Sequence, residues 1–208
     1  MIAKLIKWIT LPFPKEETHL TRYLAYRELG KAKSILPSKF EKAASISGSN
    51  HLCEILGIER QYIKELNHPE YDVRRLPFLD ASFDICVADQ VIEHVESDLN
   101  SVFKEVSRIL DFGGIFVNAT VMTYPIHYGP KDMWRITPEG HQYLFESNGF
   151  EVITSGSWGG FQAVQLLALN LARLPVPKCS WHPVRKIAEN QSTDWPVVVW
   201  AIGKKISK

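Results

Sequence analysis

The sequence predicts an α/β fold in which a mostly parallel sheet is flanked by helices. Compact apolar runs of strand length alternate with longer amphipathic segments along most of the 208 residues. In the clearest case the apolar run Phe83–Ala88 leads through a polar stretch into an amphipathic segment, which stops at Gly113-Gly114 before the apolar run Ile115–Val117. A strand, a helix and a strand in this order form one unit of an open parallel sheet, whose ligands bind beyond the carboxyl ends of the strands.

The composition is that of one domain with appendages. Hydrophobic residues make up 45% of the chain, which is ample for a core, and the formal net charge of +1 gives no reason to expect a nucleic-acid partner. The three cysteines, Cys53, Cys86 and Cys179, lie far apart and form no CxxC motif. We therefore expect a reduced, cytoplasmic protein without a disulfide framework or structural zinc.

Residues 1–40 are expected to form a helical segment that covers the site of an α/β domain over residues 41–208. Within residues 1–14, apolar side chains follow helical spacing, with Lys4 and Lys7 among them. Two interpretations stay open: this helix packs on the domain, or it is a basic amphipathic foot on a membrane surface. Apolar runs as long as a membrane span, about 20 residues, are absent from the sequence.

Local patterns place the other elements. Thr137 followed by Pro138 is a typical helix start, and Gly149 is a typical helix end. Only 24 positions separate Gly48 from Asp72, so the fold is expected to be shortened between its first and fourth strands. Helices are expected over residues 18–36, 51–56, 137–148 and 161–174. Strands are expected over residues 42–47, 61–65, 71–73, 83–88, 115–122, 150–155 and 195–203, and an irregular segment over 175–190.

The segment from Leu76 to Gly114 reads LPFLDASFDICVADQVIEHVESDLNSVFKEVSRILDFGG. Its ordered motifs LPF, SFD, EH, EV-x-RIL and GG resemble class I S-adenosylmethionine-dependent methyltransferases, especially a small-molecule subgroup associated with cell-surface glycan and lipid biosynthesis. The resemblance spans about residues 43–160. It implies a Rossmann-like methyltransferase fold, S-adenosylmethionine as the cofactor, and a small-molecule acceptor such as a sugar or a glycan or lipid intermediate. Self-association of the chain stays open.

The turn Ser47-Gly48-Ser49 after the first strand is expected to approach the cofactor, because glycine lets the backbone come close to a ligand. A lone glycine is also typical of a plain turn. The resemblance implies an acidic residue at the position of Ser45, and this departure weakens the expected contact with the methionine ammonium. Glu65 is the candidate for the two ribose hydroxyls, with a solvated surface glutamate as the alternative.

The resemblance assigns the adenine amine to Asp72 and the adenine ring to the backbone amide of Val73, with a turn-capping aspartate as the alternative. Asp89, Gln90 and Val91 would line the methionine and sulfonium region, where a carboxylate suits a cation. For Asp89, capping of the following helix is the alternative.

Two histidines are candidates for the general base that removes a proton from a hydroxyl acceptor. His94 belongs to the EH motif and lies a few residues beyond a strand end, and histidine accepts a proton near neutral pH. A structural or cofactor-contacting role is its alternative. His127 is the second candidate, in a long aromatic loop at the ligand edge.

The same loop, TYPIHYGPKDMWR over residues 123–135, is expected to form the acceptor pocket. Arg135 would grip a phosphate or carboxylate, with an ion pair to Glu139 as the alternative. The histidines and aspartates lack metal-ligand spacing, so no metal is expected. The candidate acceptor contacts are Tyr124, Tyr128, Trp134 and Arg135.

These observations favour an S-adenosylmethionine-dependent methyltransferase that acts on a small molecule, with O-methylation preferred. A methyltransferase fold that has lost catalysis and acts as a binding or scaffold protein is the alternative, which Ser45 and the single loop glycine favour. A dehydrogenase is disfavoured because the glycine-rich dinucleotide fingerprint is missing.

Overall fold

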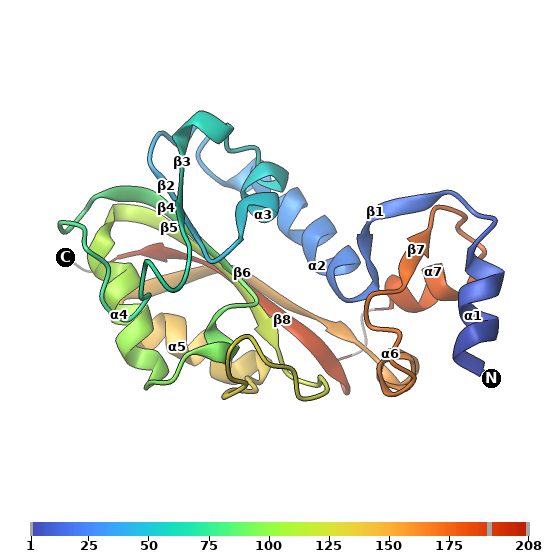
Figure 1. Cartoon of the computed structure of the whole chain (residues 1–208). Helices are drawn as coiled ribbons and strands as arrows, with labels where there is room; N and C mark the ends of the chain where they lie inside the picture. The colour runs from blue at the N-terminus through green and yellow to red at the C-terminus, as the bar shows by residue number, and fades with distance from the viewer. Residues whose placement is uncertain (1, 191–192, 207–208) are drawn as a thin grey trace.

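The structure, a computed structural model that describes residues 2–190 and 193–206, contains a six-stranded sheet in the order β3-β2-β4-β5-β8-β6 (Figure 1). All of these strands run in one direction except β8, which is antiparallel to both neighbours. The predicted Rossmann-like, mostly parallel α/β fold is therefore confirmed. The strands are β2 (Ala43–Ile46), β3 (Ile63–Leu66), β4 (Phe83–Asp89), β5 (Leu110–Val121), β6 (Phe150–Gly159) and β8 (Pro196–Lys205).

Helices cover both faces of the sheet because its central strands are apolar on both sides. In β4, Ile85 and Val87 join the core beneath α2 and α3, whereas Cys86 and Ala88 join the core beneath α4 and α5. The helices are α1 (Ile2–Thr10), α2 (Leu20–Lys31), α3 (Asn50–Ile55), α4 (Leu99–Ile109), α5 (Pro138–Ser147), α6 (Phe161–Ala168) and α7 (Pro183–Ala188). Short 3₁₀ turns are η1 (Ala32–Ile35), η2 (Arg60–Tyr62) and η3 (Ile92–His94).

Three expectations about regular structure are wrong. The helix expected over residues 161–174 ends at Ala168. Residues 71–73 form no strand, and only an isolated bridge joins Asp72 to Arg75, so the strand at Phe83 follows directly on the second strand of the sheet. The segment 175–190, expected to be irregular, contains β7 (Pro175–Pro177) and α7. β7 pairs with β1 (Lys15–His19) in a separate two-stranded sheet, where its prolines are tolerated because neither strand is central.

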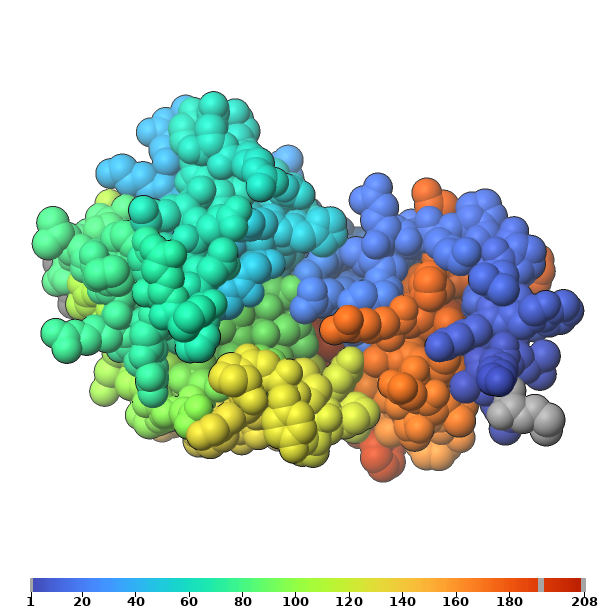
Figure 2. Space-filling view, viewed as in Figure 1, coloured from blue at the N-terminus to red at the C-terminus, as the bar shows by residue number. Residues whose placement is uncertain are grey.

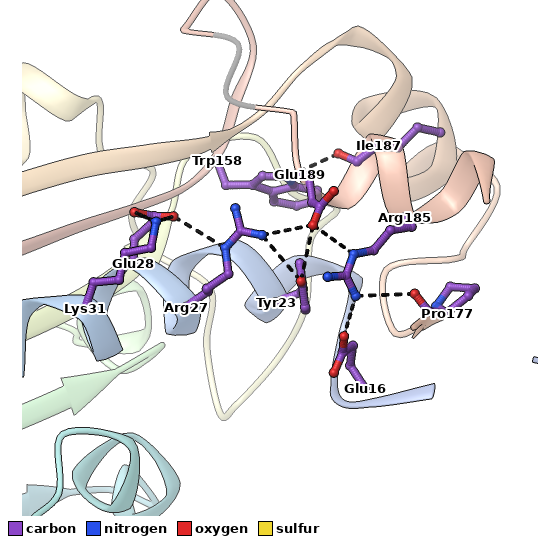
Figure 3. Close-up of polar contacts among 10 residues, drawn as sticks. All are labelled: Glu16, Tyr23, Arg27, Glu28, Lys31, Trp158, Pro177, Arg185, Ile187 and Glu189. Carbon is purple, nitrogen blue, oxygen red and sulfur yellow. Dashed lines mark hydrogen bonds and ion pairs between the residues drawn. The ribbon is translucent and has the colours of Figure 1, made fainter. Parts of the chain in front are cut away.

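The N-terminal segment is bound to the region around α7 by a polar cluster (Figure 3). Glu189 accepts hydrogen bonds from Arg27 Nη1 at 2.9 Å, from Arg185 Nε at 2.8 Å and from the Tyr23 hydroxyl at 3.4 Å. Arg185 also pairs with Glu16 in β1. These contacts hold α2 in place along the sheet, with one end of the helix near the carboxyl end of β4.

A buried pair of polar residues fixes that end of β4. Asn118 in β5 donates through Nδ2 to the carbonyl of Ala88 at 2.8 Å, and its Oδ1 accepts from His141 Nε2 in α5 at 2.6 Å. Both side chains are fully buried. Because each buried polar group has its partner, the pair specifies how β4, β5 and α5 meet.

We expect His141 to make the protein lose stability in acid. Burial lowers the pKa of His141 to about 3, whereas an unfolded histidine titrates near about 6.5. Between these values only the unfolded state takes up the proton, so the free energy of unfolding falls as the pH falls, by at most about 1.4 kcal/mol per pH unit. In urea unfolding from pH 7 to 4.5, His141→Gln should show a shallower pH dependence than the wild type, and identical slopes would contradict this assignment.

Candidate functional site

A cavity of about 370 Å³ opens at the carboxyl ends of β2 and β4. Six predicted site residues line it, and they come from three separate segments of the chain. The segment after β3 and the loop 123–135 both appear on the face shown in Figure 2, in teal and yellow. The lining residues are Ser47, His68, Tyr71, Asp72, Val73, Arg74, Gln90, Val91, His94, Val95, Glu96, Gly129 and Pro130.

The backbone turns sharply where β2 and β4 end. Ser47, Gly48 and Gln90 have φ angles of 44°, 85° and 58°, in the left-handed region that only glycine adopts without cost. Strain of this kind is characteristic of functional sites. A Cβ atom on Gly48 would meet nothing within 4 Å, so this turn faces open space. The Nε2 of Gln90 is buried and has no partner among the described residues, which suits a polar ligand at this place.

Asp72 is held as an ionised carboxylate at the cavity wall. Arg74 donates to it from Nε at 2.8 Å and from Nη2 at 2.6 Å. These hydrogen bonds lower the pKa of Asp72. Arg74 and Tyr71 were not predicted as site residues, although both flank the predicted Asp72-Val73 pair and proximity in the sequence could have indicated them.

The structure places Glu65 and Ser49 outside the cavity lining. β3 continues one residue beyond Glu65, to Leu66. The side chain of Glu65 does not enter the cavity, and its Oε2 accepts a hydrogen bond from Asn67 Nδ2 at 3.2 Å. Asn67 in turn receives the backbone N–H of Gly48 at 3.0 Å. The Ser49 hydroxyl is fully engaged, because it donates to the Ile46 carbonyl at 2.5 Å and accepts from the N–H of Asp89 at 2.8 Å.

Asp89 faces α2 and does not line the cavity. Its Oδ2 accepts from the Tyr26 hydroxyl and lies 3.3 Å from Arg22 Nη1. Burial raises the pKa of Asp89, and the interactions with Arg22 and Tyr26 oppose that rise. No sequence pattern indicates Arg22 or Tyr26, because they reach Asp89 from a helix more than 60 positions earlier in the chain.

The two candidate bases lie side by side, although they are far apart in the sequence. The ring centroids of His94 and His127 are 4.8 Å apart in an edge-to-face arrangement, and the ring of Tyr124 lies 4.9 Å from that of His127. Burial lowers the pKa of His127, which favours its neutral form at pH 7. With the carboxylate of Glu93, the two histidines place three donor atoms within 4.8 Å of one another, a cluster that sequence spacing did not reveal.

The remaining candidates of the loop 123–135 mostly stabilise it. Arg135 binds Asp132 through both terminal nitrogens and donates to the carbonyl of Trp134 at 2.9 Å, so its guanidinium is engaged within the loop. Its partner is Asp132 and not Glu139. Trp134 donates from Nε1 to the carbonyl of Val95 at 2.9 Å. The side chain of Tyr128 is 82% exposed and does not line the cavity.

We expect the Asp132–Arg135 pair to stabilise the protein. The side chain of Asp132 is 1% exposed, and hydrogen bonds from Arg135 lower the pKa of Asp132 to about 2. Asp132→Asn should reduce the free energy of unfolding by about 1–3 kcal/mol, because charged hydrogen bonds are lost. Asp80→Asn is the matched control, since Asp80 also pairs with an arginine, Arg108, but its side chain is 81% exposed.

The control should change the stability by less than about 1 kcal/mol. Urea unfolding of both variants at pH 7 measures the difference, and equal effects would show that the buried pair has no special role.

Comparisons with known proteins bear on the domain type and on the fold. Residues 35–118 match the family model described as a methyltransferase domain. No curated protein matches the chain. Among solved structures, an S-adenosylmethionine-dependent methyltransferase from Mesorhizobium loti is 14% identical with a TM-score of 0.53, over 89% of this chain and 98% of that one. One from Archaeoglobus fulgidus is also 14% identical, with a TM-score of 0.54 over 88% and 94%.

A further similar structure is a putative methyltransferase of Haloferax volcanii, solved in complex with a methyltransferase activator. It is 16% identical, with a TM-score of 0.56 over 90% of this chain and 91% of that one. These identities establish the common fold. The neighbours from Mesorhizobium loti and Archaeoglobus fulgidus depend on S-adenosylmethionine, the cofactor that the sequence predicts. Residues 35–118 thus match a methyltransferase domain, and the chain as a whole shares the fold of S-adenosylmethionine-dependent methyltransferases.

Proposed function

We propose that the protein transfers a methyl group from S-adenosylmethionine to an oxygen of a small acceptor, such as a sugar or a glycan or lipid intermediate. One observation carries the proposal: six residues expected to hold the cofactor or do the chemistry line a single open cavity. A scaffold protein that had lost the reaction would be expected to fill this space with side chains, so the open cavity favours an enzyme.

The residues around the cavity suit the three parts of the cofactor. Asp72 offers a carboxylate to the adenine amine, and the amide of Val73 follows it at the wall. The turn at Ser47 and the side-chain amide of Gln90, whose Nε2 has no partner among the described residues, offer polar groups to the methionine end. In place of Glu65, His68 lies at the cavity wall just beyond β3, where the ribose is expected.

The acceptor is assigned to the side of the cavity where His94 meets His127 and Tyr124. Methyl transfer is an in-line displacement, so alignment of the two reactants supplies much of the acceleration. A neutral imidazole near a hydroxyl acceptor can receive its proton. His94 lines the cavity and His127 contacts its ring, which supports a role for these two side chains toward the acceptor oxygen.

Cofactor binding tests this proposal directly. We expect calorimetry to show binding of S-adenosylmethionine and S-adenosylhomocysteine to the wild type. Asp72→Ala should weaken it about tenfold or more, because a charged hydrogen bond contributes about 1.5–3 kcal/mol and about 1.4 kcal/mol equals tenfold. Glu65→Gln, whose side chain lies outside the cavity lining, should change the affinity by less than about threefold. No binding of either nucleotide to folded wild-type protein would instead favour the scaffold interpretation.

We also propose that α1 contacts a membrane surface peripherally. Its apolar side chains are exposed: Ile2 is 59%, Leu5 56% and Trp8 70% exposed. Lys4 and Lys7 lie on the same helix, which suits an anionic lipid surface, and tryptophan favours the membrane interface. No helix in the described part of the chain is long and apolar enough to span a bilayer.

Vesicle co-sedimentation tests the role of α1. We expect wild-type protein to bind vesicles that contain phosphatidylglycerol, and the double substitution Leu5→Glu and Trp8→Glu to reduce binding at least tenfold, since each side chain contributes about 1.5–3 kcal/mol when buried. Leu79→Glu, a change at an exposed leucine outside α1, is the control and should bind like the wild type. If the double variant instead alters only the size of the protein in gel filtration, α1 mediates self-association.

A further inference from the structure

Glu93 is a buried carboxylate with only one of its oxygens satisfied. It lies in η3 and is fully buried. Its Oε2 accepts a hydrogen bond from Thr120 Oγ1 at 2.8 Å, whereas Oε1 is buried without a partner among the described residues. Leaving such an oxygen unpaired is unfavourable. This oxygen therefore suits a ligand that the protein's own side chains do not supply.

The two neighbouring imidazoles are oriented as metal ligands are. The Nδ1 of His94 lies 2.5 Å from the carbonyl of Lys131, and the Nδ1 of His127 lies 3.4 Å from Oδ2 of Asp132 and 3.3 Å from the carbonyl of Pro125. An oxygen at Nδ1 favours the proton on that nitrogen and leaves the lone pair on Nε2. Metal-bound histidines show this arrangement, in which a carbonyl or carboxylate holds the other ring nitrogen.

The cationic side chains near Glu93 are already paired with other carboxylates. Two arginines lie near enough to affect it, Arg22 and Arg135. Each already has its own carboxylate partner, Asp89 for Arg22 and Asp132 for Arg135. The two ion pairs cancel, so the charge of an ionised Glu93 is not compensated by these neighbours. A divalent cation beside Glu93 would therefore meet a net negative surrounding.

We propose that Glu93, His94 and His127 together bind one divalent transition-metal ion of the zinc type. Two imidazoles and a carboxylate are a known catalytic zinc ligand set, which leaves a fourth position open for water or substrate. The three donor atoms lie within 4.8 Å of one another. Donors around tetrahedral zinc lie about 3.4 Å apart, so binding would require the donor atoms to approach one another by at most about 1.4 Å.

Of the three proposed ligands His94 lines the cavity, so an ion bound here would lie next to the side proposed for the acceptor. This consequence rests on the proposed methyl transfer. An ion at this place lowers the pKa of an acceptor hydroxyl, whose proton passes to water. The oxygen keeps its electron pair and forms the new O–CH₃ bond while the S–CH₃ bond breaks, which leaves S-adenosylhomocysteine. In this form the histidines act as ligands, and the proton does not have to reach either ring.

Metal titration of the full chain tests the site without any assay of activity. Protein freed of metal with a chelator is titrated with Zn²⁺ by calorimetry and with Co²⁺ by visible absorption, which reports the geometry of the ligands. We expect one equivalent of each ion to bind. Glu93→Gln and His127→Gln should each weaken binding about tenfold or more. His68→Gln is the matched control, a histidine of the same cavity outside the cluster.

Because Glu93 is buried, Glu93→Gln could fail to fold, and circular dichroism checks this. His127 lies on a loop with its side chain 33% exposed, so His127→Gln keeps the test valid in that case. Absence of a stoichiometric metal, or equal affinity in the wild type and in folded His127→Gln, would overturn the proposal. Titration of the metal-free protein with S-adenosylmethionine runs in parallel, so a failure of the metal site is distinguished from a failure of the cofactor site.

Discussion

The carboxyl end of β4 is the constraint on which the rest of the site depends. Three successive backbone groups there are fixed by residues of β5 and of the turn after β2. Asn118 holds the carbonyl of Ala88, Ser49 receives the N–H of Asp89, and the N–H of Gln90 binds the carbonyl of Ala119. Because β2, β5 and α5 all converge on these few atoms, the strained turn at Gln90 is held in place and the chain is directed into the cavity.

The sequence predicted the order of the central strands along the chain and, to within one residue, where β2 and β4 end. The residues after β2 and β4 could be assigned to one edge because parallel strands end on the same side of a sheet. The prediction that Glu65 lies in the cavity also depended on local sequence, and the structure does not bear it out. The strand was expected to end at residue 65 but ends at Leu66. Because successive side chains of a strand point to opposite faces of the sheet, an error of one residue exchanges the residue expected at the site. Residues 71–73 failed because short β-like sequences also occur in loops.

Contacts between distant segments could not be predicted from one sequence. Nothing in the pattern of α2 shows that Arg22 and Tyr26 reach Asp89, and no spacing places His127 beside His94. Arg135 illustrates the same limit in the opposite direction. From the sequence alone, Arg135 could bind an anionic ligand. In the folded chain its guanidinium group is instead paired with Asp132. Charged residues of a loop often find their partners within the protein, and only the fold reveals which remain available.

The division between fixed and variable parts explains why the neighbours resemble this chain in path but not in sequence. Identities of 14–16% over about nine-tenths of the chain show that the sheet and its helices tolerate wide substitution. The side of the cavity proposed for the acceptor is formed by a loop whose His127, Asp132 and Arg135 contact one another, with His127 next to Glu93 and His94. Since acceptor choice resides in such a loop, the activities of structural neighbours carry little information about it. Under the proposed function, the chemistry of that cluster, and above all whether it holds a cation, therefore decides which acceptors the domain can activate.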